Sequence, residues 1–146
     1  MKFLKSMLLF LLAVILTACG SAITPQTTAE VVGQKVSVDG GSYTDVTVAD
    51  LQTMLAKKDF TFVNVHIPFE GNIAKTDQSI PYDQIGQNLE KLPADKNAQI
   101  VLYCRSGRMS TIAAKTLVGL GYTNIWNLSG GMVAWEQAGL PIDHKP

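Results

Sequence analysis

The pattern of hydrophobic and polar positions predicts alternating strands and helices from about residue 46 to the end of the chain. Residues 60–65 and 99–103 are short runs of apolar and β-branched side chains, typical of strands in a parallel sheet with both faces covered. Residues 125–128 predict a further strand. The order of elements predicts an α/β fold, with a mainly parallel sheet of about five strands flanked by helices on both faces.

Three segments carry apolar residues at helical spacing. The first follows Thr47, whose hydroxyl can cap the helix together with Asp50 three residues later. The second covers residues 110–120 and ends before Gly121, where a left-handed C-terminal cap belongs. The third follows Gly131 and closes the domain.

The first residues have the pattern of an export signal. Lys2 and Lys5 form a positively charged start, and residues 7–16 are an unbroken apolar run that is too short to span a bilayer as a helix. Leu16-Thr17-Ala18-Cys19 follows and resembles a bacterial lipobox, in which the cysteine becomes the lipid-bearing first residue of the mature protein. Ordinary signal cleavage nearby, which would leave Cys19 as a free thiol, is the alternative.

These signals divide the chain into three parts. We expect a lipoprotein signal peptide over residues 1–18, a lipidated N-terminus and flexible tether over residues 19–45, and a folded domain over residues 46–146. A short edge strand over residues 33–38 is compatible with this division. The expected location is outside the cytoplasm, with the protein anchored through Cys19 to the cell membrane or the outer membrane.

Charge and composition exclude several classes of function. The full chain has no net charge, and loss of Lys2 and Lys5 would leave ten basic residues against twelve acidic ones, a net charge of −2. This balance lacks the basic patch of a nucleic-acid-binding protein. The two histidines and the cysteine left after lipidation show no metal-ligand spacing, and no glycine-rich nucleotide motif is present. We therefore expect no metal, no cofactor and no nucleic-acid partner.

One segment carries the candidate chemistry, between the predicted strand that ends at Tyr103 and the following helix. Lipidation of Cys19 would leave Cys104 as the one thiol of the exported chain, unable to form an internal disulfide. Turn N–H groups and the positive end of a helix dipole favour the thiolate form of a cysteine placed there. The candidate nucleophile is Cys104, and the candidate substrate-binding residues are Arg105, Ser106, Gly107, Arg108, Met109 and Ser110.

The distribution of arginine supports a reactive cysteine. The chain has two arginines against ten lysines, and both arginines, Arg105 and Arg108, lie within four residues of Cys104. Arginine offers a planar, permanently charged fork that matches an oxyanion. A buried structural cysteine beside two solvated cations is the alternative. The strand end, Gly107 and the two arginines together favour a reactive, anion-binding loop.

The stretch Cys-Arg-Ser-Gly-Arg-Met-Ser, which starts at Cys104, resembles the active-site loop of rhodanese domains, a family of sulfurtransferases. Residues 127–135 (Asn-Leu-Ser-Gly-Gly-Met-Val-Ala-Trp) resemble the C-terminal signature of the same family. The resemblance implies a compact α/β domain in which Cys104 accepts a sulfane sulfur as a persulfide and passes it to a thiol or to cyanide. It also implies that backbone N–H groups of residues 105–109 cradle the outer sulfur, and that Arg105 and Arg108 orient a small anionic sulfur donor.

Two comparisons within this resemblance narrow the chemistry. Related phosphatases and arsenate reductases have arginine six residues after the cysteine, where this chain has Ser110, so the shorter loop favours sulfur as the substrate atom. Upstream, the Asp-Val-Arg usual in the family is replaced by Asn64-Val65-His66, which bears on rate and donor choice. A structural or surface role is the expectation for His66, against a role at the mouth of the site.

Two classes of function stay open at this point. The first is an enzyme that transfers sulfur through a Cys104 persulfide at the cell envelope. The second is a non-catalytic module of the same fold that carries sulfur, senses an oxidant or binds a partner. The complete loop favours the enzyme, whereas the changes at Asn64 and His66 leave its rate of turnover open.

Overall fold

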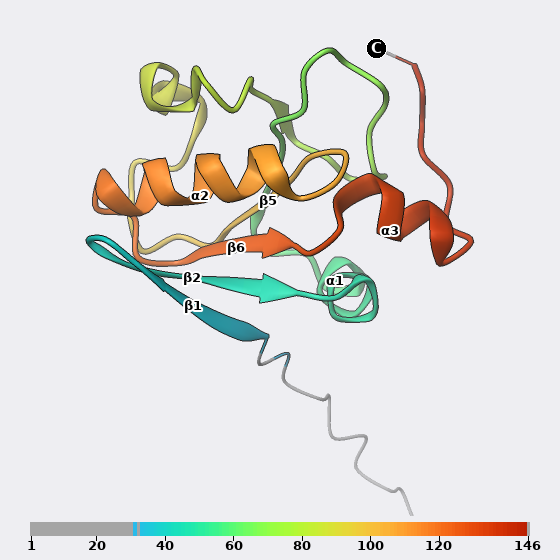
Figure 1. The fold of residues 1–146 in the computed structure, drawn as a ribbon, viewed down its shortest axis with the longest axis horizontal. Helices are drawn as coiled ribbons and strands as arrows, with labels where there is room; N and C mark the ends of the chain where they lie inside the picture. Colours follow the sequence, from blue (N-terminus) through green and yellow to red (C-terminus); the bar gives the residue numbers. More distant parts are fainter. Residues whose placement is uncertain (1–30, 32, 146) are drawn as a thin grey trace, which may run out of the picture.

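A six-stranded sheet forms the centre of the computed structural model, which describes residue 31 and residues 33–145 (Figure 1). The strands lie in the order β1-β2-β6-β5-β3-β4. Their bounds are β1 Gln34–Val38, β2 Gly41–Val46, β3 Thr61–Asn64, β4 Gln78–Ser79, β5 Ile100–Tyr103 and β6 Ile125–Leu128. The helices are α1 Val48–Ala56, α2 Arg108–Gly119 and α3 Gly131–Gln137, with short 3-10 helices η1 at Ile85–Gln87 and η2 at Leu89–Lys91.

All neighbouring strands run parallel except β1, which forms an antiparallel hairpin with β2. Strand β5 lies between β3 and β6, and all of its residues are buried. This confirms the prediction of a strand covered on both faces. Because β2, β6, β5 and β3 are parallel, their carboxyl ends meet at one edge of the sheet, which is where ligands bind in folds of this class.

Helices cover both faces of the sheet, as predicted. Helices α2 and α1 lie on opposite sides (Figure 1), and α3 shares its apolar cluster with α1. Alternate residues of β5 point to the two sides: Ile100 and Leu102 pack with α2, whereas Val101 and Tyr103 pack with α1 and α3. Each face of the sheet therefore has its own apolar core.

Local signals set the helix ends as expected. In the capping box, the Asp50 N–H donates to Thr47 Oγ1 at 3.2 Å, and the Thr47 N–H donates to Asp50 Oδ2 at 3.0 Å. The pKa of Asp50 is lowered, mainly because its carboxylate accepts a hydrogen bond from the Thr47 hydroxyl. Gly121 follows α2 with a φ of +89°, a left-handed conformation that a residue with a side chain rarely adopts.

The sheet begins earlier in the chain than the predicted domain boundary. We expected a tether up to residue 45, but β1 and nearly all of β2 lie before that point and belong to the sheet. β1 is an edge strand with mostly exposed side chains, so its sequence lacks the apolar pattern of a buried strand. β4 is too short to give any periodic signal. With these two strands the sheet has six strands rather than about five.

The predicted signal peptide over residues 1–18 and the lipidation site at Cys19 lie outside the described residues. Within the part of the chain that the structure describes, no helix is both long enough and apolar enough to cross a membrane. Export and lipidation therefore stay predictions from the sequence pattern.

Candidate active site

Cys104 lies directly after β5, at the carboxyl edge of the sheet. It is the free cysteine of the described residues, and it is only 1% exposed. Its sulfur accepts a hydrogen bond from the Gly107 N–H at 3.1 Å, and the Ser110 hydroxyl lies 3.5 Å from it. The thiol is thus a buried group with a backbone N–H directed at it, unlike a cysteine that only fills space in an apolar core.

The loop that holds the thiol ends in the first turn of α2. Gly107 is the N-cap residue and has a φ of +94°, so the chain turns sharply from the strand into the helix. Its carbonyl accepts the first helical hydrogen bond, from the Thr111 N–H at 3.0 Å. Cys104 Sγ therefore faces the N-terminal end of α2, where the helix dipole favours negative charge.

The backbone at the start of α3 is hydrogen-bonded to the backbone of the thiol loop. The Met132 N–H donates to the carbonyl of Cys104, and the Val133 N–H donates to the carbonyl of Arg105, both at 2.9 Å. This approach needs glycine at position 131, because a Cβ there would lie 2.2 Å from the Cys104 carbonyl oxygen. The glycine pair of the C-terminal motif therefore acts as a support for the backbone of the thiol loop.

The remaining predicted site residues divide between the surface and the core. Arg105, Ser106 and Arg108 are exposed, Met109 is half-buried against the core on the α2 face, and Ser110 is buried. Ser110 is the residue six positions after the cysteine, and its hydroxyl also lies 3.1 Å from the Gly107 carbonyl. At the position where related phosphatases have arginine, this loop therefore has a small buried hydroxyl.

Arg105 forms an ion pair that the sequence did not predict. Its Nη1 donates to Oε2 of Glu70, which lies on the segment after β3. This hydrogen bond is the main reason that the pKa of Glu70 is lowered from its ordinary value. The other carboxylate oxygen of Glu70 lies 3.4 Å from His66 Nε2, a long contact at which the imidazole forms no regular hydrogen bond. The Glu70 carboxylate therefore lies between His66 and Arg105, beside the loop.

Asn64, at the position where the family usually has aspartate, is matched to its surroundings. Its Nδ2 donates to the Gly71 carbonyl at 2.9 Å and to Asn72 Oδ1 at 3.0 Å, and its Oδ1 accepts from the His66 N–H at 2.9 Å. A carboxylate could replace the acceptor but neither donor. The Asn64 amide therefore satisfies all three of these hydrogen bonds, and it fixes the segment that carries Glu70.

Tyr103 fixes the same segment from β5. Its hydroxyl accepts from the Ile73 N–H at 3.0 Å, donates to Asn72 Oδ1 at 3.2 Å, and lies 2.7 Å from the hydroxyl of Thr76. Burial raises the pKa of Tyr103 to about 12, because the charged phenolate would lose its hydration. The phenol is therefore a neutral structural group at all ordinary pH values.

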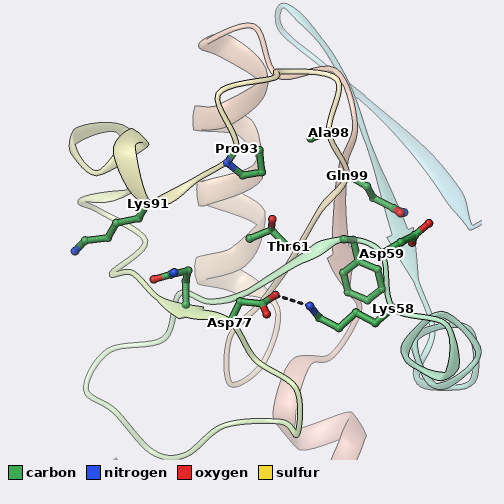
Figure 2. Close-up of a pocket in the computed structure, with 10 residues that line it drawn as sticks. Lys58, Asp59, Thr61, Asp77, Lys91, Pro93, Ala98 and Gln99 are labelled. Atoms are coloured by element: carbon green, nitrogen blue, oxygen red, sulfur yellow. Dashed lines mark hydrogen bonds and ion pairs between the residues drawn. The ribbon is translucent and has the colours of Figure 1, made fainter.

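A groove lies away from the thiol, at the amino-terminal edge of β3 and β5 (Figure 2). This groove of about 620 Å³ is lined by residues of both charges, and its described lining holds no cysteine or histidine. Its Asp77 pairs with Lys58 at 2.6 Å and accepts from the Phe62 N–H at 2.7 Å. These contacts join residues at this edge of the sheet. They account for the position of the Asp77 carboxylate without a bound ligand.

Two residues beside the loop were missed from the sequence. Glu70 is one of twelve acidic residues and lies 35 positions from Arg105, so nothing in the sequence singles it out as the partner. His144 lies near the end of the chain, and its Nδ1 is 2.7 Å from the carbonyl oxygen of Glu70. The one available signal was the spacing of four between His66 and Glu70, which is common by chance.

Comparison with known proteins identifies the family. Residues 39–138 match the family model of the rhodanese-like domain. The chain belongs to the rhodanese-like family. The match covers the loop at Cys104 and the whole C-terminal motif over residues 127–135, so the resemblance inferred from these residues is confirmed.

Sequence relatives of this rhodanese-like chain include sulfurtransferases. A protein named Sulfurtransferase from Allochromatium vinosum is 35% identical over 94 residues, which cover 62% of this chain and 85% of that protein. Rhodanese-like domain-containing protein 15, chloroplastic, from Arabidopsis thaliana is 31% identical over 101 residues, which cover 61% of this chain and 56% of that protein. The chain thus spans most of the first relative and about half of the second.

Solved structures show the same rhodanese-like fold. A rhodanese-related protein from Thermoplasma volcanium is 29% identical, with a TM-score of 0.59 over 69% of this chain and 98% of that chain. A rhodanese-like domain protein from Staphylococcus aureus is 27% identical, with a TM-score of 0.58 over 70% of this chain and 98% of that chain. The predicted fold class is therefore confirmed.

Proposed function

We propose that this rhodanese-like protein is an enzyme that moves a sulfane sulfur from a thiosulfate-type or persulfide donor to a thiol or cyanide acceptor through a persulfide on Cys104. The observation that carries the proposal is the hydrogen bond from the Gly107 N–H to Cys104 Sγ, at the first turn of α2. A thiolate at this place is stabilised by fixed dipoles, and so is the negative outer sulfur of a persulfide.

The reaction has two displacement steps. The Cys104 thiolate attacks the sulfane sulfur of thiosulfate, a new S–S bond forms, and the S–S bond to sulfite breaks, so sulfite leaves with the electron pair. Cyanide, or an acceptor thiolate, then attacks the outer sulfur of the persulfide. Thiocyanate or a new persulfide is released, and the Cys104 thiolate is restored. Neither step needs an external oxidant or a proton from the protein.

The first test is sulfur transfer by the domain from residue 31 onward, with the Cys104→Ser variant as control. We expect thiocyanate formation from thiosulfate and cyanide by the parent chain and none by the variant. After donor treatment without acceptor, Cys104 should gain about 32 Da, the mass of one sulfur, as persulfide formation requires. Circular dichroism spectra should agree between the two chains, because exchange of a sulfur for an oxygen leaves the fold intact.

The outcomes separate the two classes of function. Turnover that is lost in the serine variant supports the enzyme. One added sulfur without release to any acceptor would overturn the enzyme in favour of a sulfur-carrying module. No added sulfur from thiosulfate, a thiosulfonate or an organic persulfide would overturn both.

The proposed place of this reaction is the cell envelope, with the chain anchored through a lipid on Cys19. Support comes from the charged start, the apolar run over residues 7–16 and the Leu-Thr-Ala-Cys sequence that ends at Cys19. Cys19→Ala should move the protein from the membrane to the soluble fraction of its host. Unchanged membrane association of the variant would refute the anchor.

A further inference from the structure

The two arginines of the thiol loop have different electrostatic surroundings. Arg105 is paired with Glu70, and its side chain is still 55% exposed. Arg108, at the first position of α2, is exposed, and among the described residues no carboxylate forms an ion pair with it. The two loop arginines together with the glutamate paired to Arg105 therefore carry a formal charge of +1, rather than the +2 that the loop sequence implies. A second carboxylate, Glu136 of α3, lines the same small cavity as Glu70 and Arg105.

Glu70 is fixed in this position from several sides. His66 is 93% buried at the side chain, with 7% exposed, and its ring lies against the carboxylate with Nε2 at 3.4 Å from Oε1. The backbone carbonyl of Glu70 lies 2.7 Å from His144 Nδ1. The next residue, Gly71, has a φ of +130°, and a Cβ there would lie 2.5 Å from a side-chain carbon of Ile142. The main chain at Glu70 is therefore fixed, and its carboxylate lies between the side chains of Arg105 and His66.

The C-terminal tail completes this support. Asn72 and Asp143 form a pair of backbone hydrogen bonds, at 2.7 Å and 2.8 Å. A small cavity of about 50 Å³ remains between the tail, the loop and α3, and both Glu70 and Arg105 line it. The ion pair thus forms part of the wall of this cavity, beside the thiol loop, although neither side chain is fully buried.

We propose that Glu70 is a specificity-determining residue of the sulfur transfer proposed above, and that it favours monoanionic sulfur donors over the thiosulfate dianion. The physical reason is charge. A carboxylate near the site repels a donor in proportion to the donor's charge, so the dianion loses about twice as much interaction free energy as a monoanion. The inference rests on the proposed function, and it adds the class of donor.

Two donors that differ chiefly in charge make the comparison direct. Thiosulfate carries two negative charges, and methanethiosulfonate carries one, with a methyl group in place of one oxygen. With methanethiosulfonate, the Cys104 thiolate attacks the terminal sulfur, the new S–S bond forms, and methanesulfinate leaves with the electron pair. The protein step is the same in both reactions, so the ratio of the two kcat/KM values reports how the site treats donor charge.

The test is this ratio in the parent chain and in Glu70→Gln. Glutamine keeps the length of the side chain and an oxygen that can accept from Arg105, but it removes the charge. For removal of one negative charge beside the loop in partly hydrated surroundings, we expect kcat/KM to rise about tenfold for thiosulfate and about threefold for methanethiosulfonate. The effect should lie mainly in KM, and it should shrink as salt is added.

Three further variants sharpen the test. In Arg105→Gln, the ratio of kcat/KM for thiosulfate to kcat/KM for methanethiosulfonate should fall, whereas it should rise in Glu70→Gln. The double variant E70Q/R105Q restores the formal charge of the parent site, and its ratio should return close to the parent value. Glu90→Gln removes one negative charge from η2, away from the loop, and should leave the ratio unchanged.

The outcomes distinguish this inference from the function on which it rests. An active parent chain whose ratio does not change in Glu70→Gln would overturn the inference and leave the sulfurtransferase intact. Loss of thiosulfate activity in that variant would also overturn it, since Glu70 would then hold Arg105 in a productive position. A parent chain whose Cys104 gains no sulfur from either donor would overturn the proposed function itself.

Discussion

Two segments border the thiol, and they are held in place by different kinds of contact. The thiol loop over residues 104–110 is fixed by backbone groups: the Gly107 N–H and the first N–H groups of α3. The segment over residues 64–72, which carries Glu70, also has a backbone pair, Asn72 with Asp143, but it depends on buried side chains, chiefly the amide of Asn64 and the phenol of Tyr103. Backbone contacts depend on where glycine is allowed, whereas side-chain contacts depend on which donors meet which acceptors.

The difference has a consequence for mutation. A change that displaces the loop should affect sulfur transfer more than folding, because residues 105–108 of the loop lie outside the two apolar cores. A change in the amide and phenol contacts should affect folding more than the chemistry of each folded molecule, because these groups are buried at the ends of β3 and β5.

The largest effect on the loop is expected from Gly131→Ala. The new Cβ would lie 2.2 Å from the Cys104 carbonyl oxygen and 2.7 Å from that of Arg105, so the loop and the start of α3 must separate. Displacement of a reacting group by about 1 Å can cost about a hundredfold in rate, and we expect a loss of that order in kcat/KM for sulfur transfer.

Gly139→Ala is the matched control for this change. Gly139 also has a positive φ, +77°, but a Cβ there would meet no atom within 4 Å. Both variants carry the backbone strain of alanine in a left-handed conformation, about 1 kcal/mol. If the two variants have the same kcat/KM, any loss in Gly131→Ala comes from backbone strain and not from displacement of the loop.

The second prediction concerns Asn64→Asp, the residue usual in the family. A carboxylate, 1% exposed like the amide it replaces, would face the Gly71 carbonyl and Asn72 Oδ1 with no hydrogen to donate. We expect a loss of about 3 kcal/mol in the free energy of unfolding at pH 7, measured by urea titration. The loss should become smaller as the pH falls, because a protonated carboxyl regains one donor.

Asn88→Asp provides the comparison for Asn64→Asp. The Asn88 amide also donates to a backbone carbonyl, that of Gln84 at 2.9 Å, but in a solvent-exposed contact. Water can replace that hydrogen bond, so we expect a change within about 0.5 kcal/mol. Similar losses in both variants would contradict the role given to burial.

The smallest effect is expected from Tyr103→Phe, which removes the hydroxyl but keeps the ring in the core. The loss should be about 1 to 2 kcal/mol at neutral pH, since the Ile73 N–H and Asn72 lose a partner. The pKa of Tyr103 is about 12 in the folded chain against 10.0 in the reference state. The folded chain thus retains this proton more strongly than the unfolded chain, and the related stability is complete below pH 10 and lost as the pH rises toward 12.

The alkaline region therefore offers a second measurement on Tyr103→Phe. Unfolding of the parent chain should become easier between pH 10 and pH 12, whereas the variant should show a flatter pH profile there. Identical slopes in the two chains would mean that another group governs alkaline unfolding.

Features that depend on neighbouring residues could be predicted from the sequence, whereas contacts between distant segments could not. The strand before Cys104, the sharp turn at Gly107 and the capping box at Thr47 depend on neighbours within a few residues, and the structure has all three. β1 escaped a firm prediction because an exposed edge strand needs no apolar face. The pair of Glu70 with Arg105 depends on the path of the chain between β3 and β4, and no local pattern encodes it.

The antiparallel hairpin of β1 and β2 has a practical consequence for handling the protein. It places Gln34 next to Asp45, at the carboxyl edge of the sheet, and the tail at Asp143 pairs with Asn72 at the same edge. Both ends of the described chain therefore emerge on the side of the thiol, where a tag or a resin would crowd it. The exposed turn at Asp39-Gly40 lies at the far edge, so a label inserted there leaves the reactive side open to solution.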